Sequence, residues 1–533
     1  MKIKAFLVCL FFLAGCTSHS QKKDKPKNIL RLNIVQDPAT LDPRKSSDFV
    51  TSTLHFLLYE GVTKMTPYSL VCPAIADEIE VSDDGLEYKF HLRDAKWSNG
   101  NEITSYDFVK SWTDMLDPQF PCPNSHLLYC IYNAQAAKSG TVPLKEVGLH
   151  IIDHKTFCVI LEHPTPHLPE TLSFCTFFPV SQIDAVTNPE WSEGKNGHSP
   201  ISSGPFILTK WSRGKEIVLE KNPYYYDADH VDLDEIHLSI IDNETTCLHL
   251  FEQGELDILG VPYTGIPTDA LESLRGQGRI QTACLPASSI CTFNLGAFPF
   301  TNKHIRKAFA GAINRAEIVK NLAILGEAGY TFLPPSLMLE QEYEPLFLEK
   351  NPQIAKSNLQ KGLLELHLST SDLQDIVLIH PTTGIYPRLA QVIQDQWKKN
   401  LGVEIRLQPY EFKVFLDKLT HHNYDMALCV LIAQYHDPMS FFERFESVQN
   451  PKNYPGYCNK TYRKLLSLSH RCKDSKERLT KLHEALAVFR EDMPLCPIYH
   501  CHNPYLVQKH VKNLQLHRGG SFHLLNVRTE KKK

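Results

Sequence analysis

Hydrophobic and polar residues alternate along several short stretches of this chain. The alternation is regular over residues 86–92, 157–161 and 403–407. A period of two places every second side chain on the same face of an extended backbone, so each stretch is predicted to form a β-strand. The strands occur in both halves of the chain.

Other stretches repeat apolar residues at intervals of three or four, which is the spacing of one face of a helix. The positions are Ile305, Phe309 and Ile313 after a candidate cap at Thr301; Leu389, Ile393 and Trp397 before Gly402; and Leu479, Leu482, Leu486 and Phe489 before Pro494. Glycine favours helix ends and proline does not continue a helix, so three helices with defined ends are predicted. Strands and helices interleave, which indicates a mixed α/β fold class.

The N-terminal residues 1–15 have the pattern of a secretory signal peptide. Lys2 and Lys4 precede an apolar run over residues 5–14. That run is much shorter than the roughly 20 apolar residues that cross a bilayer, so a cleaved signal is predicted rather than a membrane span. Residues 16–27 are polar and lysine-rich, as expected of a solvated tether.

The residues around the predicted cleavage point, Leu13, Ala14, Gly15 and Cys16, resemble the bacterial lipobox. The resemblance implies that Cys16 is linked to diacylglycerol and becomes the mature N-terminus. Acyl chains then hold the protein on a membrane, since each buried methylene contributes about 0.8 kcal/mol. The alternative is that Cys16 is only the tail of an ordinary signal peptide.

Length and charge limit the classes of function. About 500 residues follow the tether, which exceeds one ordinary hydrophobic core, so two or three lobes are expected. The formal net charge is −4 and the sequence pI is near 6.7. Neither value, nor any basic stripe in the sequence, gives the electrostatic footprint of a nucleic-acid-binding protein, and no nucleic-acid partner is predicted.

Fifteen cysteines are scattered along the chain without a CxxC pair or a regular spacing. Cys9 belongs to the signal segment and Cys16 is the predicted lipid site, which leaves an odd thirteen. A chain of this length has enough core without a disulfide framework. Most of the thirteen are therefore expected to be small buried hydrophobes, and at least one is expected to be a free thiol.

Several segments occur in one order along almost the whole chain after the tether. They are residues 36–43, 58–61, 90–100, 203–206, 219–225, 254–258, 397–403 and 424–427. This order resembles the peptide/nickel class, family 5, of the extracellular solute-binding proteins of ABC transporters. The segment 90–100 carries the most specific similarity.

The resemblance implies a two-lobed α/β fold in which two crossing strands form a hinge and lobe one carries an extra subdomain. By analogy, lobe one takes residues 28–67, 198–287 and 497–533. The inserted subdomain takes residues 68–197, and lobe two takes residues 288–496. These borders rest on the resemblance alone.

The resemblance also implies a function. The protein is expected to be a monomeric receptor in the periplasm or cell envelope, lipid-anchored to a membrane, that delivers peptides or peptide-like ligands to the permease and ATPase subunits of an ABC importer. No enzyme activity and no cofactor are expected. The sequence has no GxSxG motif, and His483-Glu484 lacks the second histidine of an HExxH zinc helix.

In receptors of this family an extended peptide lies between the lobes and bonds to the protein backbone as an added strand, while its side chains enter wet pockets. Residues 424–438 are similar to the strand and turn that contact the ligand. The ligand-binding residues implied by the resemblance are Gln434, Ile432, Val430, Leu431, Leu428, Leu419, Phe412, Tyr386, Phe49, Ser47 and Tyr499.

Several of these positions depart from the family pattern. The departures are Gln434 in place of an aspartate that binds the peptide ammonium, Leu428 and Leu419 in place of arginines, Ser47 in place of a glutamate, Tyr386 in place of a histidine, and Leu431 in place of a tryptophan. Breaking a buried charge pair costs about 3 to 5 kcal/mol, so the ammonium of an unmodified peptide would be uncompensated.

Two interpretations of these departures are open. The ligand has a blocked or differently placed terminus, as in a modified or cell-wall-derived peptide, and the backbone of Val430 and Ile432 still pairs with it. Alternatively, Asp48, Asp437 or Arg388 binds the termini from new positions.

A receptor of the same fold for a metal complex or haem is the alternative function. Its candidate ligands are His500, Cys501, His502, His421, His422 and His436. Neighbouring residues on a strand point to opposite faces, so at most His500 and His502 of the first cluster could share an ion. Chance also produces such neighbours among 25 histidines, and no metal ligand is assigned.

Overall fold

The computed structural model describes residues 27–46, 48–66, 70–188, 190–194, 199–260, 263–322, 326–337, 351–472, 474–516 and 522–530. The predicted signal peptide, Cys16 and all of the tether before residue 27 lie outside these ranges, and so does Ser47. Among the helices that these ranges contain, none has the length and apolar character needed to cross a membrane.

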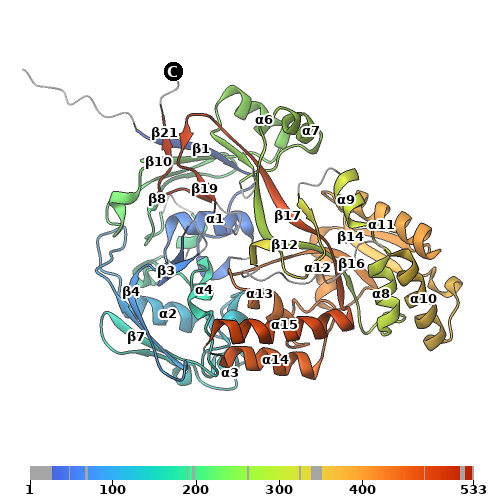
Figure 1. The fold of residues 1–533 in the computed structure, drawn as a ribbon. Helices are drawn as coiled ribbons and strands as arrows, with labels where there is room; N and C mark the ends of the chain where they lie inside the picture. Colours follow the sequence, from blue (N-terminus) through green and yellow to red (C-terminus); the bar gives the residue numbers. More distant parts are fainter. Residues whose placement is uncertain are drawn as a thin grey trace, which may run out of the picture.

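Lobe one is built on a sheet of the order β1-β10-β9-β8 (Figure 1). Its strands are β1 (Ile29–Ile34), β10 (Glu235–Ile240), β9 (Glu216–Lys221) and β8 (Phe206–Ser212), with helices α1 (Phe49–Leu58), α5 (Gln182–Thr187), α6 (Glu244–Gln253) and α7 (Thr268–Gly276) around it. The strand β1 runs parallel to β10, and Leu30 and Leu32 of β1 are fully buried. The alternation of apolar residues on these strands therefore forms the core of lobe one.

The C-terminal segment returns to lobe one. It forms the short strands β18 (Val511–Lys512), β19 (Gln515–Leu516), β20 (Phe522–His523) and β21 (Arg528–Thr529). The side-chain oxygen of Asn28 accepts hydrogen bonds from the backbone N of Thr529 at 2.7 Å and from its hydroxyl at 2.6 Å. The two ends of the described chain thus meet in one lobe.

An antiparallel sheet of the order β4-β5-β7-β6 forms the inserted subdomain. Its elements are β2 (Thr63–Met65), β3 (Val71–Pro73), β4 (Ala76–Val81), β5 (Glu87–Leu92), β6 (Leu149–Ile151), β7 (Thr156–Ile160), α2 (Ser105–Met115), α3 (Ala134–Lys138) and α4 (Leu168–Leu172). Trp112 of α2 packs edge-on against Phe90 and Phe157 of the sheet, with ring centroids 6.5 and 5.5 Å away. The strands predicted at 86–92 and 157–161 correspond to β5 and β7.

Lobe two is built on the larger part of a sheet of the order β11-β17-β12-β16-β14-β15, with β13 paired to β17, while β11 pairs with the lobe-one end of β17 at residues 505–507. The strands are β11 (Ile258–Gly260), β12 (Gln281–Phe293), β13 (Gly326–Ala328), β14 (Val377–Pro381), β15 (Arg406–Tyr410), β16 (Met426–Ile432) and β17 (Leu495–Val507). The helices are α8 (Lys303–Gly311), α9 (Arg315–Asn321), α10 (Pro352–Leu366), α11 (Tyr386–Leu401), α12 (Phe412–Thr420), α13 (Met439–Phe442), α14 (Lys460–Arg471) and α15 (Ser475–Asp492). Trp397 of α11 and Phe309 of α8 are fully buried against each other.

The helices predicted from apolar spacing are α8, α11 and α15, and Gly402 caps α11 in the left-handed conformation as expected. Three details were wrong. Ile313 lies beyond Ala312, the C-cap of α8, and is not part of the helix. Asn302, not Thr301, caps α8, because its side chain accepts hydrogen bonds from two backbone N–H groups of the first turn. The strand predicted at 403–407 begins only at Arg406, because the apolar residues before it pack into the core without pairing to β14.

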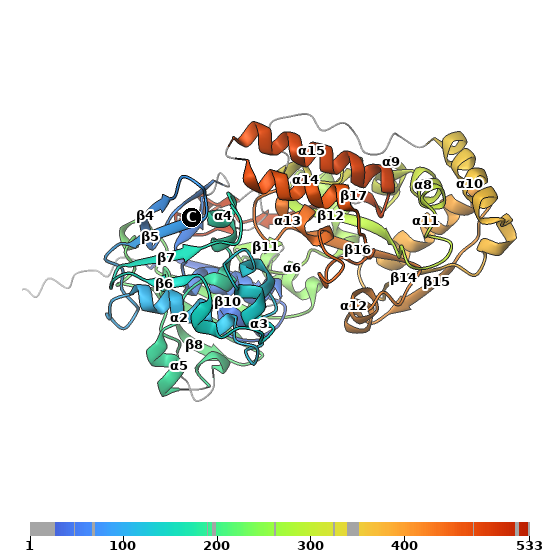
Figure 2. The same cartoon turned by 90° about the horizontal axis from the view of Figure 1, so that it is seen from below.

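Strands β12 and β17 join the two lobes, as Figures 1 and 2 show. Each has 13 residues. Ala283 and Tyr505 belong to the hydrophobic core of lobe one, while Cys291 and Cys496 belong to that of lobe two. The chain therefore has the two-lobed fold that the sequence predicts, while the exact borders of the lobes stay a prediction.

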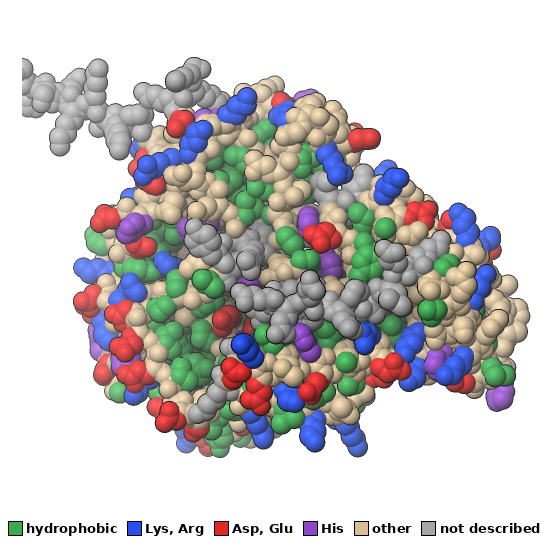
Figure 3. Space-filling view, in the orientation of Figure 1, with side chains coloured by type: hydrophobic (Ala, Val, Ile, Leu, Met, Phe, Trp, Pro, Cys, Tyr) green, Lys and Arg blue, Asp and Glu red, His purple; other side chains and the backbone are tan. Residues whose placement is uncertain are grey.

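The thirteen cysteines between Cys72 and Cys501 are all free thiols, and most are buried. The face of the molecule in Figure 3 carries Lys and Arg side chains intermixed with Asp and Glu.

Candidate ligand-binding site between the lobes

Strand β16 offers an open backbone edge at the expected peptide position. It pairs with β12 along its whole length, from Met426 to Ile432. On its other side β14 pairs only with Met426 and Ala427. Within the described ranges, residues 428–432 therefore lack a strand partner on that side, and an extended chain could add there as a further strand.

The predicted contact residues fall into two groups. Ile432 is 51% exposed and Phe412 is 54% exposed, while Val430, Gln434 and Tyr386 are half-buried. Leu419, Leu428, Leu431 and Tyr499 are buried in hydrophobic cores. Phe49 begins α1, and its side chain is outside the description, as is the whole of Ser47. In this conformation the buried leucines are packing residues, and the roles of all these positions stay a prediction.

Gln434 contacts the opposite lobe directly. Its side-chain amide donates a hydrogen bond to Asn124 Oδ1 at 2.9 Å. Asn124 is buried and donates in turn to the backbone oxygen of Ser46 at 3.1 Å. A neutral amide pair therefore bridges the lobes at the position where the family resemblance places an ammonium-binding aspartate.

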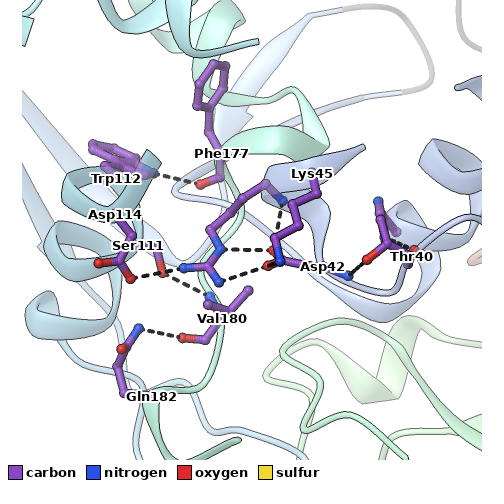
Figure 4. A network of polar contacts seen from close by, with 11 residues as sticks. Thr40, Asp42, Lys45, Ser111, Trp112, Asp114, Phe177, Val180 and Gln182 are labelled. Atoms are coloured by element: carbon purple, nitrogen blue, oxygen red, sulfur yellow. Dashed lines mark hydrogen bonds and ion pairs between the residues drawn. The ribbon is translucent and has the colours of Figure 1, made fainter. Parts of the chain in front are cut away.

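A network of buried ion pairs holds the segment of lobe one whose Ser46 carbonyl accepts the hydrogen bond from Asn124. The Arg44 guanidinium donates twice to Asp42, at 2.9 Å each, and once to Asp114 of α2 at 3.1 Å. Figure 4 shows both carboxylates beside this guanidinium, together with the bond from Trp112 to the backbone of Phe177. A fully hydrogen-bonded network of this kind rigidifies the turn beside Ser46.

Basic side chains surround Gln434. Burial, followed by the charge of Lys452, lowers the pKa of His126 of the subdomain to about 4, while the neighbouring Gln434 side chain acts in the opposite direction. Arg444 is buried and donates to the backbone oxygens of Ile432 and Ser440. Burial and the neighbouring Arg444 lower the pKa of Lys452 to about 7. We call Asn124, His126, Gln434, Arg444 and Lys452 the lobe junction.

Asp437, one of the candidate compensating charges, is already paired. Arg478 of α15 donates to both of its oxygens, at 2.7 and 2.8 Å, and both residues are buried. Asp48 caps α1 by accepting from Thr51 N at 2.9 Å. Arg388 is exposed on α11. The carboxylate of Asp437 is therefore fully occupied by the Arg478 guanidinium.

A histidine cluster lies beside this pair and also spans the lobes. His167 of the subdomain stacks on Tyr435 of lobe two with ring centroids 5.5 Å apart. His470 of α14 lies 5.6 Å from His167 and 4.8 Å from His163. Burial lowers the pKa of His167 to about 4 and that of His470 to about 2. The rings of His167 and His470 are therefore neutral contacts between the lobes.

The histidines considered as metal ligands make separate hydrogen bonds with other side chains and with the backbone. His500 lies within hydrogen-bonding distance of Ser288 Oγ at 2.9 Å and Thr331 Oγ1 at 3.0 Å, so both ring nitrogens are occupied. His422 Nδ1 lies 2.9 Å from the Tyr454 carbonyl. Across the described ranges, no group of three His, Cys, Asp or Glu residues has an arrangement that could hold a metal ion.

Sequence reasoning missed Asn124, His126, Arg444 and Lys452. They come from segments far from Gln434 in the chain or from a loop with no distinctive pattern, and no local signal in the sequence connects them. Their proximity results from the contact between subdomain and lobe two.

Comparison with known proteins gives the family. Residues 71–453 match the model described as bacterial extracellular solute-binding proteins, family 5 middle. The chain is 33% identical over 524 residues to the oligopeptide-binding protein OppA of Bacillus subtilis, covering 97% of this chain and 96% of that protein. It is 25% identical over 523 residues to the periplasmic murein peptide-binding protein MppA of Escherichia coli, covering 96% of each.

Solved structures agree with this assignment. The crystal structure of a periplasmic oligopeptide-binding protein of Borrelia burgdorferi, OppAIV, superposes with a TM-score of 0.80 at 26% identity and covers 95% of this chain and 100% of that chain. The oligopeptide ABC transporter substrate-binding domain of Bacillus anthracis gives a TM-score of 0.77 at 25% identity, with 95% and 99% covered. The chain belongs to family 5 of the bacterial extracellular solute-binding proteins.

Proposed function

We propose that this protein captures peptides outside the cytoplasm and delivers them to the permease and ATPase subunits of an ABC importer. The open edge of β16 supports the proposal, because main-chain pairing binds a peptide whatever its side chains are. The names of the OppA and MppA relatives, which describe peptide binding in those proteins, also support it. The receptor acts as a monomer in the periplasm or cell envelope and does not act as an enzyme.

The ligand in this proposal is a peptide without a free ammonium group at the Gln434 end. The observation that carries it is the amide bridge from Gln434 to Asn124, beside which Arg444, bonded to Ser440, places positive charge. An ammonium group placed there would meet like charge and no free carboxylate, which disfavours its burial.

Titration calorimetry tests this function with one tetrapeptide in free-amine and N-acetylated forms. The acetylated form should bind more tightly, by roughly tenfold or more, since the cost of burying an ammonium group is removed. A strong preference for the free amine would refute the proposed end-group chemistry. Mass spectrometry of molecules that co-purify with the protein would identify the natural ligand.

The lipid anchor at Cys16 is a separate part of the proposal. Palmitate labelling of cells that express the protein should depend on this cysteine. Undiminished labelling of a Cys16→Ala variant would contradict the anchor without affecting the proposed ligand.

A further inference from the structure

The turn that follows β16 contacts the inserted subdomain at two adjacent residues. Gln434 of the lobe junction donates its side-chain amide to Asn124 Oδ1 at 2.9 Å. The next residue, Tyr435, stacks its ring on that of His167, with the ring centroids 5.5 Å apart and an angle of 8° between the ring planes. Asn124, His167 and Tyr435 are buried. One short segment of lobe two therefore carries both contacts.

The lobe-two side of these contacts is held in place by bonds within lobe two. The backbone N of Gln434 donates to Ser440 Oγ at 2.8 Å. The hydroxyl of Tyr435 donates to the Glu443 carboxylate, also at 2.8 Å. A force on either side chain is therefore transmitted to the body of lobe two rather than absorbed by a loose loop.

The subdomain side is held as firmly. The side-chain amide of Asn124 donates to the backbone oxygen of Ser46 at 3.1 Å and to Thr176 Oγ1 at 3.2 Å. Both of its N–H groups are thus used on its own side of the contact, and its Oδ1 is the atom that faces Gln434. His167 caps α4, and its carbonyl accepts a hydrogen bond from the Thr171 hydroxyl at 3.1 Å.

Apolar packing surrounds the ring stack. One hydrophobic core contains Leu128 and Leu168 of the subdomain together with Tyr435 and Met439 of lobe two. Figures 1 and 2 both show α13 of lobe two beside α4 of the subdomain. The stack of Tyr435 on His167 is therefore part of a continuous apolar contact, and the amide bond of Gln434 lies one residue away.

The same turn is continuous with the proposed ligand-binding strand. Gln434 follows Ile432, the last residue of β16, by two positions. The partners of Gln434 and Tyr435 belong to the opposite lobe, so any separation of the lobes breaks both contacts together. The open edge of β16 and the two contacts thus move as one unit when the lobes open.

We propose that Gln434 and Tyr435 form a latch with Asn124 and His167, through which the inserted subdomain holds lobe two in the closed conformation. This role of the subdomain goes beyond peptide capture and does not depend on which ligand pairs with β16. Opening of the lobes requires the loss of an amide hydrogen bond and of an aromatic stack in one step.

Hydrogen exchange of the unliganded protein, measured by mass spectrometry, tests the latch. Protected amides at the contact exchange when the lobes open, and their rate reports the opening equilibrium. Gln434→Ala should raise the exchange rate over residues 124–131 and 433–445 about threefold to tenfold, the change expected for one hydrogen bond. Strand β5 and helix α11 should exchange as in the wild type.

Further variants separate the latch from local packing. In a background of Asn124→Ala, Gln434→Ala should have no additional effect, because both residues act through one bond. His167→Ala should also raise the exchange rate at the contact, whereas His167→Phe keeps a ring against Tyr435 and should preserve the protection. Asn358→Ala, on α10 at the outer end of lobe two, is the matched control and should leave the contact segments unchanged.

The outcomes are distinct from those that test peptide capture, because no peptide is present. Unchanged exchange in Gln434→Ala and His167→Ala would overturn the latch. A rise of the same size over β5 and α11 would assign the effect to global stability and overturn it as well, and so would additive effects of Asn124→Ala and Gln434→Ala. Failure of the wild type to bind the acetylated tetrapeptide would refute the proposed ligand and leave the latch standing.

Discussion

The histidine contact between the lobes should make the stability of this protein fall in mild acid. His167 and His470 lie in contact and are 5% and 6% exposed. Arg478 adds positive charge beside them, and Asp437, which Arg478 binds, supplies the adjacent negative charge. Protonating either ring places a cation in this contact, and both pKa values are therefore lowered.

The direction and the size of this change in stability follow from the linkage between protonation and folding. A group whose pKa is lower in the folded state stabilises the fold above its unfolded pKa, near 6.5, and this stabilisation is lost as the pH falls below that value. With a folded pKa of about 4 for His167, lowering the pH from 7.5 to 5 costs about 2 kcal/mol. The lower pKa of His470 gives nearly the same cost, because at pH 5 the unfolded pKa sets the limit.

The assay is urea unfolding at pH 7.5 and pH 5 of the wild type and of His470→Asn. Burial also lowers the pKa values of His55, His126 and His500, so only the difference between the two proteins is diagnostic. The variant should lose about 2 kcal/mol less than the wild type between the two pH values. His249→Asn, on the exposed surface of α6, is the matched control. Equal losses in all three proteins would refute the reasoning.

Other predictions concern separate features. Arg478→Met leaves Asp437 buried without its partner and should lower the free energy of unfolding by about 3 to 5 kcal/mol, whereas replacing both residues by apolar ones should cost less; equal costs would show that the pair is not coupled. Gly204→Ala places a Cβ 2.7 Å from the backbone at the end of α1 and should cost about 1 to 3 kcal/mol in urea unfolding, while Gly276→Ala has open space and should be near neutral.

The sequence predicted the elements whose signal is local. The apolar face of α11 lies within 16 consecutive residues, and the Gly402 cap follows directly. The periodicity of apolar residues was therefore sufficient to predict this helix and its end. The beginning of β15 was misplaced because Val403 and Ile405 are buried by packing rather than by strand pairing, and periodicity does not distinguish the two. The candidate site depends on a contact between Asn124 and Gln434, 310 residues apart, which no local pattern encodes. The resemblance to the family located Gln434, but its partner Asn124 became visible only when the chain was folded.

The hydrogen bonds between Asn28 and Thr529 join two segments of lobe one that are 501 residues apart in the chain. The strand β1 pairs with β10, which follows it late in the chain, and lobe one is completed by the pairing of β18 with β21. Because synthesis proceeds from the N-terminus, lobe one would stay incomplete until these C-terminal strands are made, while lobe two could gather most of its core earlier. A truncation that removes β18 to β21 should therefore impair the folding of lobe one before it impairs the packing of lobe two.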